Sequence, residues 1–207
     1  MAHDGPAALN AVVEFAAVRN VLQGRYWSDA MPLGRSRAEP IVSGQSICAE
    51  SIDGQSISGQ SIGVFRKILI LCVGNICRSP TAEYLLRRQL AGRDVEISSA
   101  GLGALVGHPV ESHAMDLLQE HGIDASPHRA RQLDVQMLRD AELVLGMERR
   151  HLAAAARLAP EASGKLFLLG RWLEFDSVPD PYRQPRQAFE DVYGLIERGV
   201  GSWVRYL

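Results

Sequence analysis

The residues best suited to chemistry lie in a short segment in which Arg78 follows Cys72 by six positions. A cysteine is a strong nucleophile as a thiolate, and a guanidinium offers paired donors that match the oxygens of a phosphate. Gly74 and Asn75 lie between them, and both tolerate the backbone dihedrals of a tight anion-binding loop. The spacing therefore predicts a loop that binds a tetrahedral oxyanion, although a buried core cysteine at a strand end also fits it.

The elements around this segment favour the chemical interpretation. The aliphatic run 68–71 predicts a strand buried in a parallel sheet, and Cys72 stands at its end. Ser79 suits the N-cap and Pro80 the first turn of a helix that we expect to reach about Leu90. Amides at a helix start, together with the helix dipole, bind anions and favour the thiolate form of Cys72.

Strands and helices alternate along the rest of the chain. Further strands are expected at 95–101, 143–147 and 166–170, and helices at about 110–121, 148–158 and 189–203. This order predicts an α/β fold, namely a four-stranded parallel sheet with helices on both faces. Ligands of such folds bind at the carboxyl ends of the strands, where Cys72 is expected.

A candidate acid lies between the last expected strand and the last expected helix. Asp180 is flanked by Pro179 and Pro181, which stiffen the backbone around it. If Cys72 displaces a phenolate, a carboxylic acid at this edge of the sheet could protonate the departing oxygen. From spacing alone, a simple loop is the favoured interpretation of this segment.

Five segments together resemble the low-molecular-weight protein-tyrosine phosphatases, in particular the bacterial branch that works with exopolysaccharide and capsule tyrosine kinases. In chain order they are CVGNICRSP, SSAGLGALVGHP, HRARQL, GKLFLLG and PDPYR, and the resemblance covers about residues 66–205. It implies a cysteine-dependent phosphoric monoester hydrolase that forms a phosphocysteine and needs no metal or cofactor. It also implies a phosphotyrosine protein as partner, expected to be a bacterial tyrosine autokinase that controls exopolysaccharide production.

The resemblance also implies roles for individual residues. Cys72 matches the nucleophile, Arg78 the phosphate clamp and Asp180 the general acid. Ser79 matches the hydroxyl that steadies the thiolate, and Tyr182 matches an aromatic wall of the pocket. Three residues match a network that holds the loop in shape, namely Asn75, Ser99 and His128. The residues expected to contact the substrate are Val73, Gly74, Asn75, Ile76, Cys77, Ser79 and Tyr182.

Three other functions are compatible with this fold. Arsenate reduction needs further cysteines to relay a disulfide, and none follows Cys77. Phosphoarginine phosphatases resemble this chain but carry a small polar residue at the position of Ile76. A non-catalytic phosphate-binding module would not need every chemical residue. Cys77 itself has two open interpretations, a redox partner that protects Cys72 through a disulfide and a packing residue.

Composition limits the remaining possibilities. The 207 residues are 46% hydrophobic with a net charge of −2, so we expect one ordinary domain plus an extension and no nucleic-acid partner. The chain contains no apolar run of about 18 residues, so no membrane insertion is expected. The three cysteines do not form a disulfide framework, and with no secretory signal pattern the expected location is the cytoplasm.

The first 63 residues differ from the rest in composition. Within them, 43–62 consist of four five-residue units, SGQSI, CAESI, DGQSI and SGQSI. A period of five gathers the isoleucines on no single face of a helix or strand, so residues 1–63 are expected to be a disordered leader. The phosphatase domain is expected at 64–207. Valine codons can start bacterial translation, which makes Val64 a candidate first residue, testable by mass spectrometry of the native N-terminus.

Overall fold

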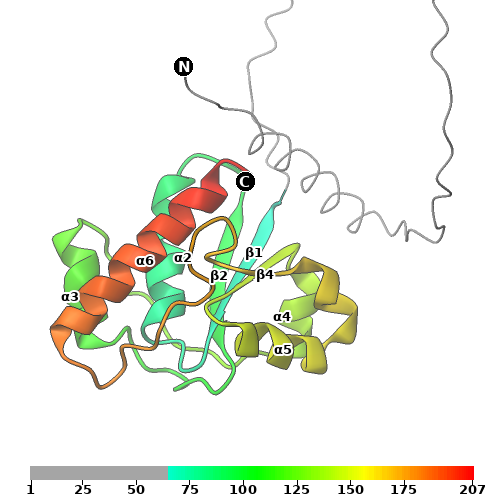
Figure 1. Ribbon diagram of the computed structural model, residues 1–207, viewed down its shortest axis with the longest axis horizontal. Coiled ribbons are helices and arrows are strands. Elements are labelled where there is room, and N and C mark those ends of the chain that lie inside the picture. Colours follow the sequence, from blue (N-terminus) through cyan, green and yellow to red (C-terminus); the bar gives the residue numbers. More distant parts are fainter. Residues whose placement is uncertain (1–64) are drawn as a thin grey trace, which may run out of the picture. The chain divides into compact units, whose positions relative to one another are not determined.

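The structure, a computed structural model, describes residues 65–207 (Figure 1). The predictions for 1–63 lie outside the described residues. The sheet consists of β1 (Lys67–Cys72), β2 (Glu96–Gly101), β3 (Leu143–Gly146) and β4 (Leu166–Leu168). The strands lie in the order β2-β1-β3-β4, and every neighbouring pair is parallel. The predicted four-stranded parallel sheet is therefore confirmed.

Helices cover both faces of this sheet, as the alternation predicted (Figure 1). One face carries α2 (Arg78–Gln89), α3 (Ser112–Glu120) and α6 (Arg186–Val204), and the other carries α4 (Val135–Asp140) and α5 (Arg149–Leu158). A 3-10 helix, η1 (Pro160–Lys165), connects α5 to β4. Helix α4 was not predicted, because only Leu138 of its six residues is buried and no periodic pattern results.

The central strand β1 is buried on both sides, which explains its unbroken aliphatic sequence. Leu69 and Leu71 pack in a cluster with Leu138 of α4 and Ala155 of α5. Because side chains alternate along a strand, Ile70 faces the opposite layer, where α2 contacts the sheet. The strand interior is therefore fixed by two apolar layers, and its carboxyl end is held in place.

The order of the strands creates a crevice at the end of β1. The chain passes from β1 to β2 on one side and later crosses to β3 on the other side of β1. Loops that leave neighbouring strands in opposite directions open a ligand site at their carboxyl ends. Cys72 is the last residue of β1 and lies at this position.

Strand β4 is shorter than predicted and ends at Leu168 rather than at residue 170. The chain turns there, since the Leu173 amide donates to the Gly170 carbonyl at 2.9 Å. Gly170 is required at this turn, because a Cβ on it would lie 2.3 Å from the Phe175 carbonyl oxygen. The turn starts the long loop that carries Asp180 back across the sheet edge.

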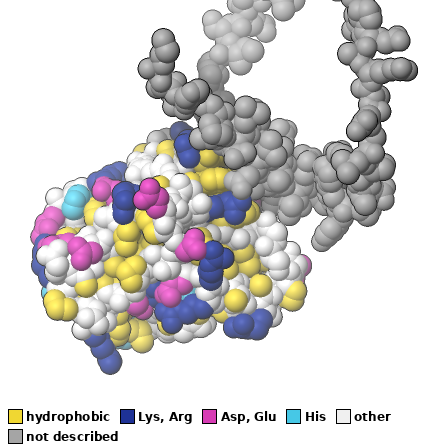
Figure 2. Space-filling model, in the orientation of Figure 1, with side chains coloured by type: hydrophobic (Ala, Val, Ile, Leu, Met, Phe, Trp, Pro, Cys, Tyr) yellow, Lys and Arg dark blue, Asp and Glu magenta, His cyan; other side chains and the backbone are white. Residues whose placement is uncertain are grey.

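Basic and acidic side chains are interspersed with apolar ones on the face shown in Figure 2. Within residues 65–207, no helix combines the length and apolar character needed to cross a bilayer. Within the same range, no group of three or more His, Cys, Asp or Glu side chains is placed to hold a metal ion.

Candidate active site

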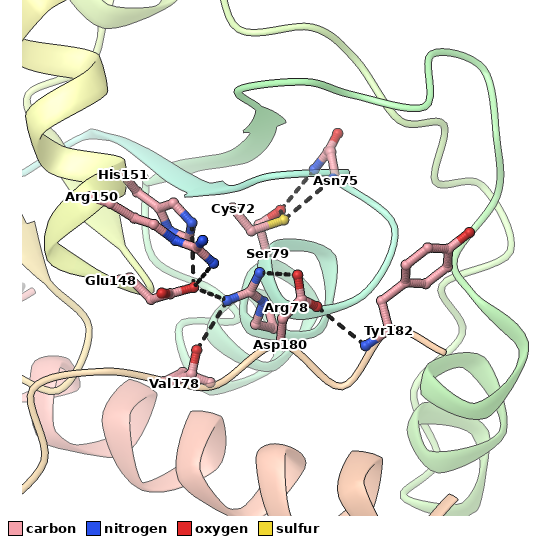
Figure 3. A network of polar contacts seen from close by, with 10 residues as sticks. All are labelled: Cys72, Asn75, Arg78, Ser79, Glu148, Arg150, His151, Val178, Asp180 and Tyr182. Carbon is pink, nitrogen blue, oxygen red and sulfur yellow. Dashed lines mark hydrogen bonds and ion pairs between the residues drawn. The ribbon is translucent and has the colours of Figure 1, made fainter. Parts of the chain in front are cut away.

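The segment between β1 and α2 wraps around the sulfur of Cys72 (Figure 3). Helix α2 begins at Arg78 with Cys77 as its N-cap, so the prediction of Ser79 as N-cap was wrong. The Ser79 hydroxyl lies 2.8 Å from Cys72 Sγ and accepts a hydrogen bond from Asn75 Nδ2 at 2.9 Å. Because that bond uses a lone pair of the hydroxyl, its proton is available to the sulfur. The Ser79 hydroxyl therefore hydrogen-bonds to the thiol and does not cap the helix.

A backbone amide also points at the sulfur. The Asn75 N–H donates to Cys72 Sγ at 3.3 Å, and only 2% of Cys72 is exposed. Hydrogen bonds to a sulfur stabilise its thiolate relative to its thiol. The amide of Asn75 and the hydroxyl of Ser79 thus form two polar contacts with the sulfur of Cys72.

Asn75 is the central residue of the loop. Its φ of 55° places it in the left-handed region, which Asn tolerates better than most residues. Gly74 was expected to share this role, but its φ is not positive. The Asn75 amide group donates to Ser79 Oγ and Ser99 Oγ and accepts from the Arg131 backbone N–H, all within 2.9 Å.

Two more residues complete the support of Asn75. His128 Nε2 lies 2.8 Å from the Asn75 carbonyl oxygen, which can only accept, so this ring nitrogen carries the proton. Ser99 accepts from Asn75 and donates to Glu83 Oε2 at 2.5 Å. All four side chains are buried. The structure therefore brings together Asn75, Ser99 and His128, and it adds Glu83, which was not predicted.

We expect Asn75→Ala to lower the free energy of unfolding by about 2–4 kcal/mol and to reduce phosphatase turnover at least about tenfold. The variant leaves buried partners unsatisfied and strains an alanine at positive φ. Chemical denaturation and steady-state kinetics measure the two effects. Asn75→Gly removes the same bonds without the strain, so it should recover about 1 kcal/mol of stability but not the turnover. Full activity of both variants would contradict the role of this network.

Arg78 is almost completely buried and is held by three groups (Figure 3). One terminal nitrogen donates to Glu148 Oε1 at 2.6 Å and to the Val178 carbonyl at 3.0 Å. The other donates to Asp180 Oδ2 at 2.5 Å. A buried guanidinium held by two carboxylates has a fixed plane, which a bidentate phosphate ligand requires.

Asp180 reaches this position through the loop between β4 and α6. Val178 is fully buried, and its N–H donates to the Met147 carbonyl at 2.9 Å, which pins the loop to the end of β3. The Asp180 carboxylate also accepts from the Tyr182 N–H at 3.2 Å. The stiff segment predicted from the flanking prolines therefore places its carboxylate beside Arg78.

A cavity of about 250 Å³ joins these groups. Cys72, Arg78, Asp180 and Tyr182 line it, although Asp180 follows Cys72 by 108 positions in the sequence. Its remaining walls come from loop residues, namely Val73, Gly74, Ile76, Cys77, Gly103, Leu105 and Arg183. Asn75 and Ser79 were also expected to contact the substrate, but both are buried and do not line the cavity.

Glu148 contacts Arg78, and His151 lies next to Glu148; neither residue was predicted from the sequence. Burial alone would raise the pKa of Glu148, but hydrogen bonds from Arg150 and Arg78 outweigh burial and lower it. His151 lies with Nε2 3.6 Å from Glu148 Oε1 and has no hydrogen-bond partner on either ring nitrogen. Burial, followed by the charge of Arg78, lowers the pKa of His151 to about 4. Glu148 lies two positions after β3, at the sheet edge that holds the ligand, but this position does not identify Arg78 as its partner.

The depressed pKa of His151 predicts acid sensitivity. The unfolded chain binds a proton near pH 6.5, whereas the folded protein does so only near pH 4. Stability is therefore fully present above about pH 6.5 and is lost as the pH falls to about 4, by roughly 3 kcal/mol. Urea unfolding of His151→Phe between these values should show a flatter pH dependence. His108→Gln, which changes an exposed histidine, should keep the wild-type slope; equal slopes for all three proteins would contradict the assignment.

Cys77 is buried in the same loop that follows Cys72. Burial, followed by the charge of Glu111, raises the pKa of the Cys77 thiol far above its usual range, which keeps it protonated. Both thiols are free. The redox role of Cys77 stays a prediction, which a search for a Cys72–Cys77 peptide after peroxide treatment and non-reducing digestion can test.

Comparison with known proteins points to one family. The sequence model of the family "Low molecular weight phosphotyrosine protein phosphatase" matches residues 67–207. The chain is 46% identical over 143 residues to the low molecular weight protein-tyrosine-phosphatase Etp of Escherichia coli K12, covering 69% of this chain and 95% of the relative. It is also 46% identical over 144 residues to Wzb of Salmonella typhimurium, covering 70% and 95%.

Solved structures give the same result. The crystal structure of the tyrosine phosphatase AmsI of Erwinia amylovora matches with a TM-score of 0.66 and 42% identity, covering 69% of this chain and 93% of that one. Vibrio vulnificus Wzb in complex with benzylphosphonate matches with a TM-score of 0.65 and 40% identity, covering 69% and 99%.

Proposed function

The chain belongs to the low molecular weight phosphotyrosine protein phosphatase family, and from that premise we propose that Cys72, Arg78 and Asp180 hydrolyse phosphotyrosine through a phosphocysteine. The observation that carries this proposal is the single cavity lined by all three side chains. A sulfur, a guanidinium and a carboxylate around one cavity supply the nucleophile, the clamp and the proton that the reaction needs.

The first step transfers the phosphoryl group to sulfur. The Cys72 thiolate attacks phosphorus, the bond to the tyrosyl oxygen breaks, and the proton of Asp180 neutralises the departing oxygen. Arg78 and the loop amides stabilise the negative charge that the three equatorial oxygens of the phosphoryl group carry in the transition state. Substrate must take over the Arg78 donor that Asp180 occupies in the free enzyme, and this exchange releases Asp180 toward the leaving group.

The second step returns the enzyme to its starting state. Asp180, now ionised, removes a proton from water, the water oxygen attacks phosphorus, and the bond to Cys72 sulfur breaks. Phosphate leaves, and the thiolate is again stabilised by the Ser79 hydroxyl and the Asn75 amide. No metal or cofactor enters either step.

An aryl substrate fits the walls of the cavity. Ile76 and Leu105 are aliphatic, and Tyr182 is an exposed aromatic that can stack on a phenyl ring. Benzylphosphonate, which the Vibrio vulnificus relative holds, has the same combination of a ring and a tetrahedral anion. These features favour phosphotyrosine over phosphoarginine, which lacks the ring.

We place the enzyme in the cytoplasm, because a catalytic thiol needs a reducing compartment. Its partner is a phosphotyrosine protein, for which a bacterial tyrosine autokinase controlling exopolysaccharide is our candidate, since the relatives Etp and Wzb are bacterial. The domain boundary proposed at residue 64 agrees with a family match that begins at residue 67.

Peptides of one sequence that carry phosphotyrosine, phosphoserine or phosphoarginine test the substrate class. We expect phosphate release from the phosphotyrosine peptide alone, and faster release from phosphoarginine would overturn the proposal. Co-expression with the candidate autokinase, followed by an anti-phosphotyrosine blot, tests the partner. The kinase signal should fall with the wild-type enzyme and persist with Cys72→Ser, and an unchanged signal with both would exclude that kinase.

A further inference from the structure

Arg183 lies at the cavity and has no role in the two chemical steps. It follows Tyr182 directly, lines the same cavity as Cys72, and is exposed to solvent. Its guanidinium carbon lies 5.3 Å from the centre of the Tyr182 ring. A guanidinium stacked by its face on a ring keeps its N–H donors free at the edge.

The cavity contains two cations, and they differ in availability. Arg78 is buried and already paired with Glu148 and Asp180. Arg183, by contrast, forms no ion pair with any carboxylate among residues 65–207. A further anion that approaches the cavity from solvent therefore meets one unpaired positive group among the lining residues, and this group is Arg183.

The backbone of Arg183 is held in an uncommon conformation. Its φ of 64° lies in the left-handed region, and within residues 65–207 the only other residue besides glycine with positive φ is Asn75 of the catalytic loop. A long side chain at such a φ costs free energy, and strain of this kind gathers at functional sites. The conformation keeps Arg183 at the cavity beside Tyr182.

Apart from Arg183, and from Asp180, the side chain of which is 39% exposed and pairs with Arg78, the other exposed side chains that line the cavity are apolar. Val73, Leu105 and Tyr182 are exposed to 36%, 38% and 41%, and none of them carries a charge. Residues that flank a phosphotyrosine in a peptide emerge at this rim, since neighbouring Cα atoms are only about 3.8 Å apart. A flanking anion would therefore find a single partner there.

We propose that Arg183 is a specificity-determining residue that binds a second anion of the substrate, carried by a residue next to the phosphotyrosine. This inference rests on the proposed tyrosine phosphatase function and refines its substrate class. The anion is a carboxylate of Asp or Glu or a second phosphate, because a guanidinium fork binds both in the same way. The enzyme thus acts best on acidic or multiply phosphorylated tyrosine segments.

A matched set of phosphotyrosine peptides tests this inference. The two residues that flank the phosphotyrosine are Ala, Asp, Lys or phosphoserine, and kcat/KM is measured for each peptide at low and high salt. For the wild type we expect about fivefold higher kcat/KM with Asp or phosphoserine than with Ala, and lower values with Lys, because exposed ion pairs contribute at most about this factor. The preference should shrink at high salt. The Asp and phosphoserine arms distinguish the two sources of the anion.

Variants assign the preference to one side chain. Arg183→Ala should abolish the preference, Arg183→Glu should reverse it toward Lys, and Arg183→Lys should retain part of it. Arg186→Ala is the matched control, because Arg186 is a neighbouring arginine that pairs with Glu120 and Glu190 and does not line the cavity; it should keep the wild-type preference. Turnover of all peptides without any preference, or a preference that survives in Arg183→Ala, would overturn this inference alone. Absence of turnover for every peptide would overturn the proposed function as well.

Discussion

Replacing Cys72 with serine should lower the kcat for aryl phosphates by on the order of 10⁵-fold or more, which is the effect of removing the nucleophile of a covalent mechanism. A serine hydroxyl at this position stays protonated, because the surrounding donors are too weak to ionise an alcohol. Steady-state assays with p-nitrophenyl phosphate measure the loss. The variant should remain folded, since Ser79 and Asn75 can bond to a hydroxyl as they do to the sulfur.

A binding measurement separates lost chemistry from lost structure. The Cys72→Ser protein should still bind inorganic phosphate, detected as a rise of its melting temperature, because Arg78 and the loop amides are unchanged. If the folded variant kept more than a small fraction of wild-type turnover, another group would have to be the nucleophile.

Replacing Asp180 with asparagine should reduce kcat by about 10²–10⁴-fold, the range of general acid catalysis. The loss should depend on the leaving group. A nitrophenolate departs without a proton and should be affected least, whereas phenyl phosphate needs the proton and should be affected most. Inorganic phosphate should bind more tightly to the variant, because a neutral amide competes less well than a carboxylate for Arg78.

Asp176→Asn is the matched control for this prediction. Asp176 lies in the same loop but forms an exposed ion pair with Arg149, remote from the cavity lining. Its replacement should leave the kcat values and their dependence on the leaving group unchanged. An equal loss for both substrates in Asp180→Asn would show that this carboxylate positions Arg78 and donates no proton to the leaving oxygen.

The sequence was sufficient to predict the fold and to select Cys72, Arg78 and Asp180 as candidate site residues, because each is marked by a short local motif. The aliphatic run before Cys72 is buried on both sides and so could be read as a central parallel strand. Parallel strands end at one edge of a sheet, so the loops that follow β1 and β4 leave the sheet at the same edge, although β3 lies between these strands. This rule made Asp180 a candidate at the sheet edge of Cys72, and its role as the acid came from the resemblance to the phosphatase family.

The contacts that tune the site could not be predicted, because they join residues far apart in sequence. Glu148 reads as the start of a helix, and only the folded chain brings it 2.6 Å from Arg78, 70 positions away. The burial of His151 depends on the same packing. Helix-capping propensity alone was misleading for Ser79. Serine is a favoured N-cap residue, but the Ser79 hydroxyl hydrogen-bonds to the Cys72 thiol and to Asn75, and Cys77 takes the N-cap position.

The pairing of Arg78 with Glu148 and Asp180 would link phosphate binding to the release of Asp180. In the proposed mechanism, Glu148 keeps its hydrogen bond to one terminal nitrogen of Arg78, while Asp180 gives up the other terminal nitrogen to the incoming phosphate. Binding and activation of the acid are therefore linked, since the same donor that receives the phosphate frees Asp180 for proton transfer. Under this proposal, Arg78 acts both in substrate binding and in the timing of the first step.

The covalent intermediate is the most direct test of the chemistry at Cys72. Wild-type enzyme is mixed with p-nitrophenyl phosphate and quenched with acid within milliseconds, and its peptides are analysed by mass spectrometry. The predicted result is one phosphoryl group on the Cys72 peptide, and none on that peptide in Cys72→Ser. Rapid turnover with no phosphorylated Cys72, or with phosphate on another residue, would contradict catalysis through a phosphocysteine.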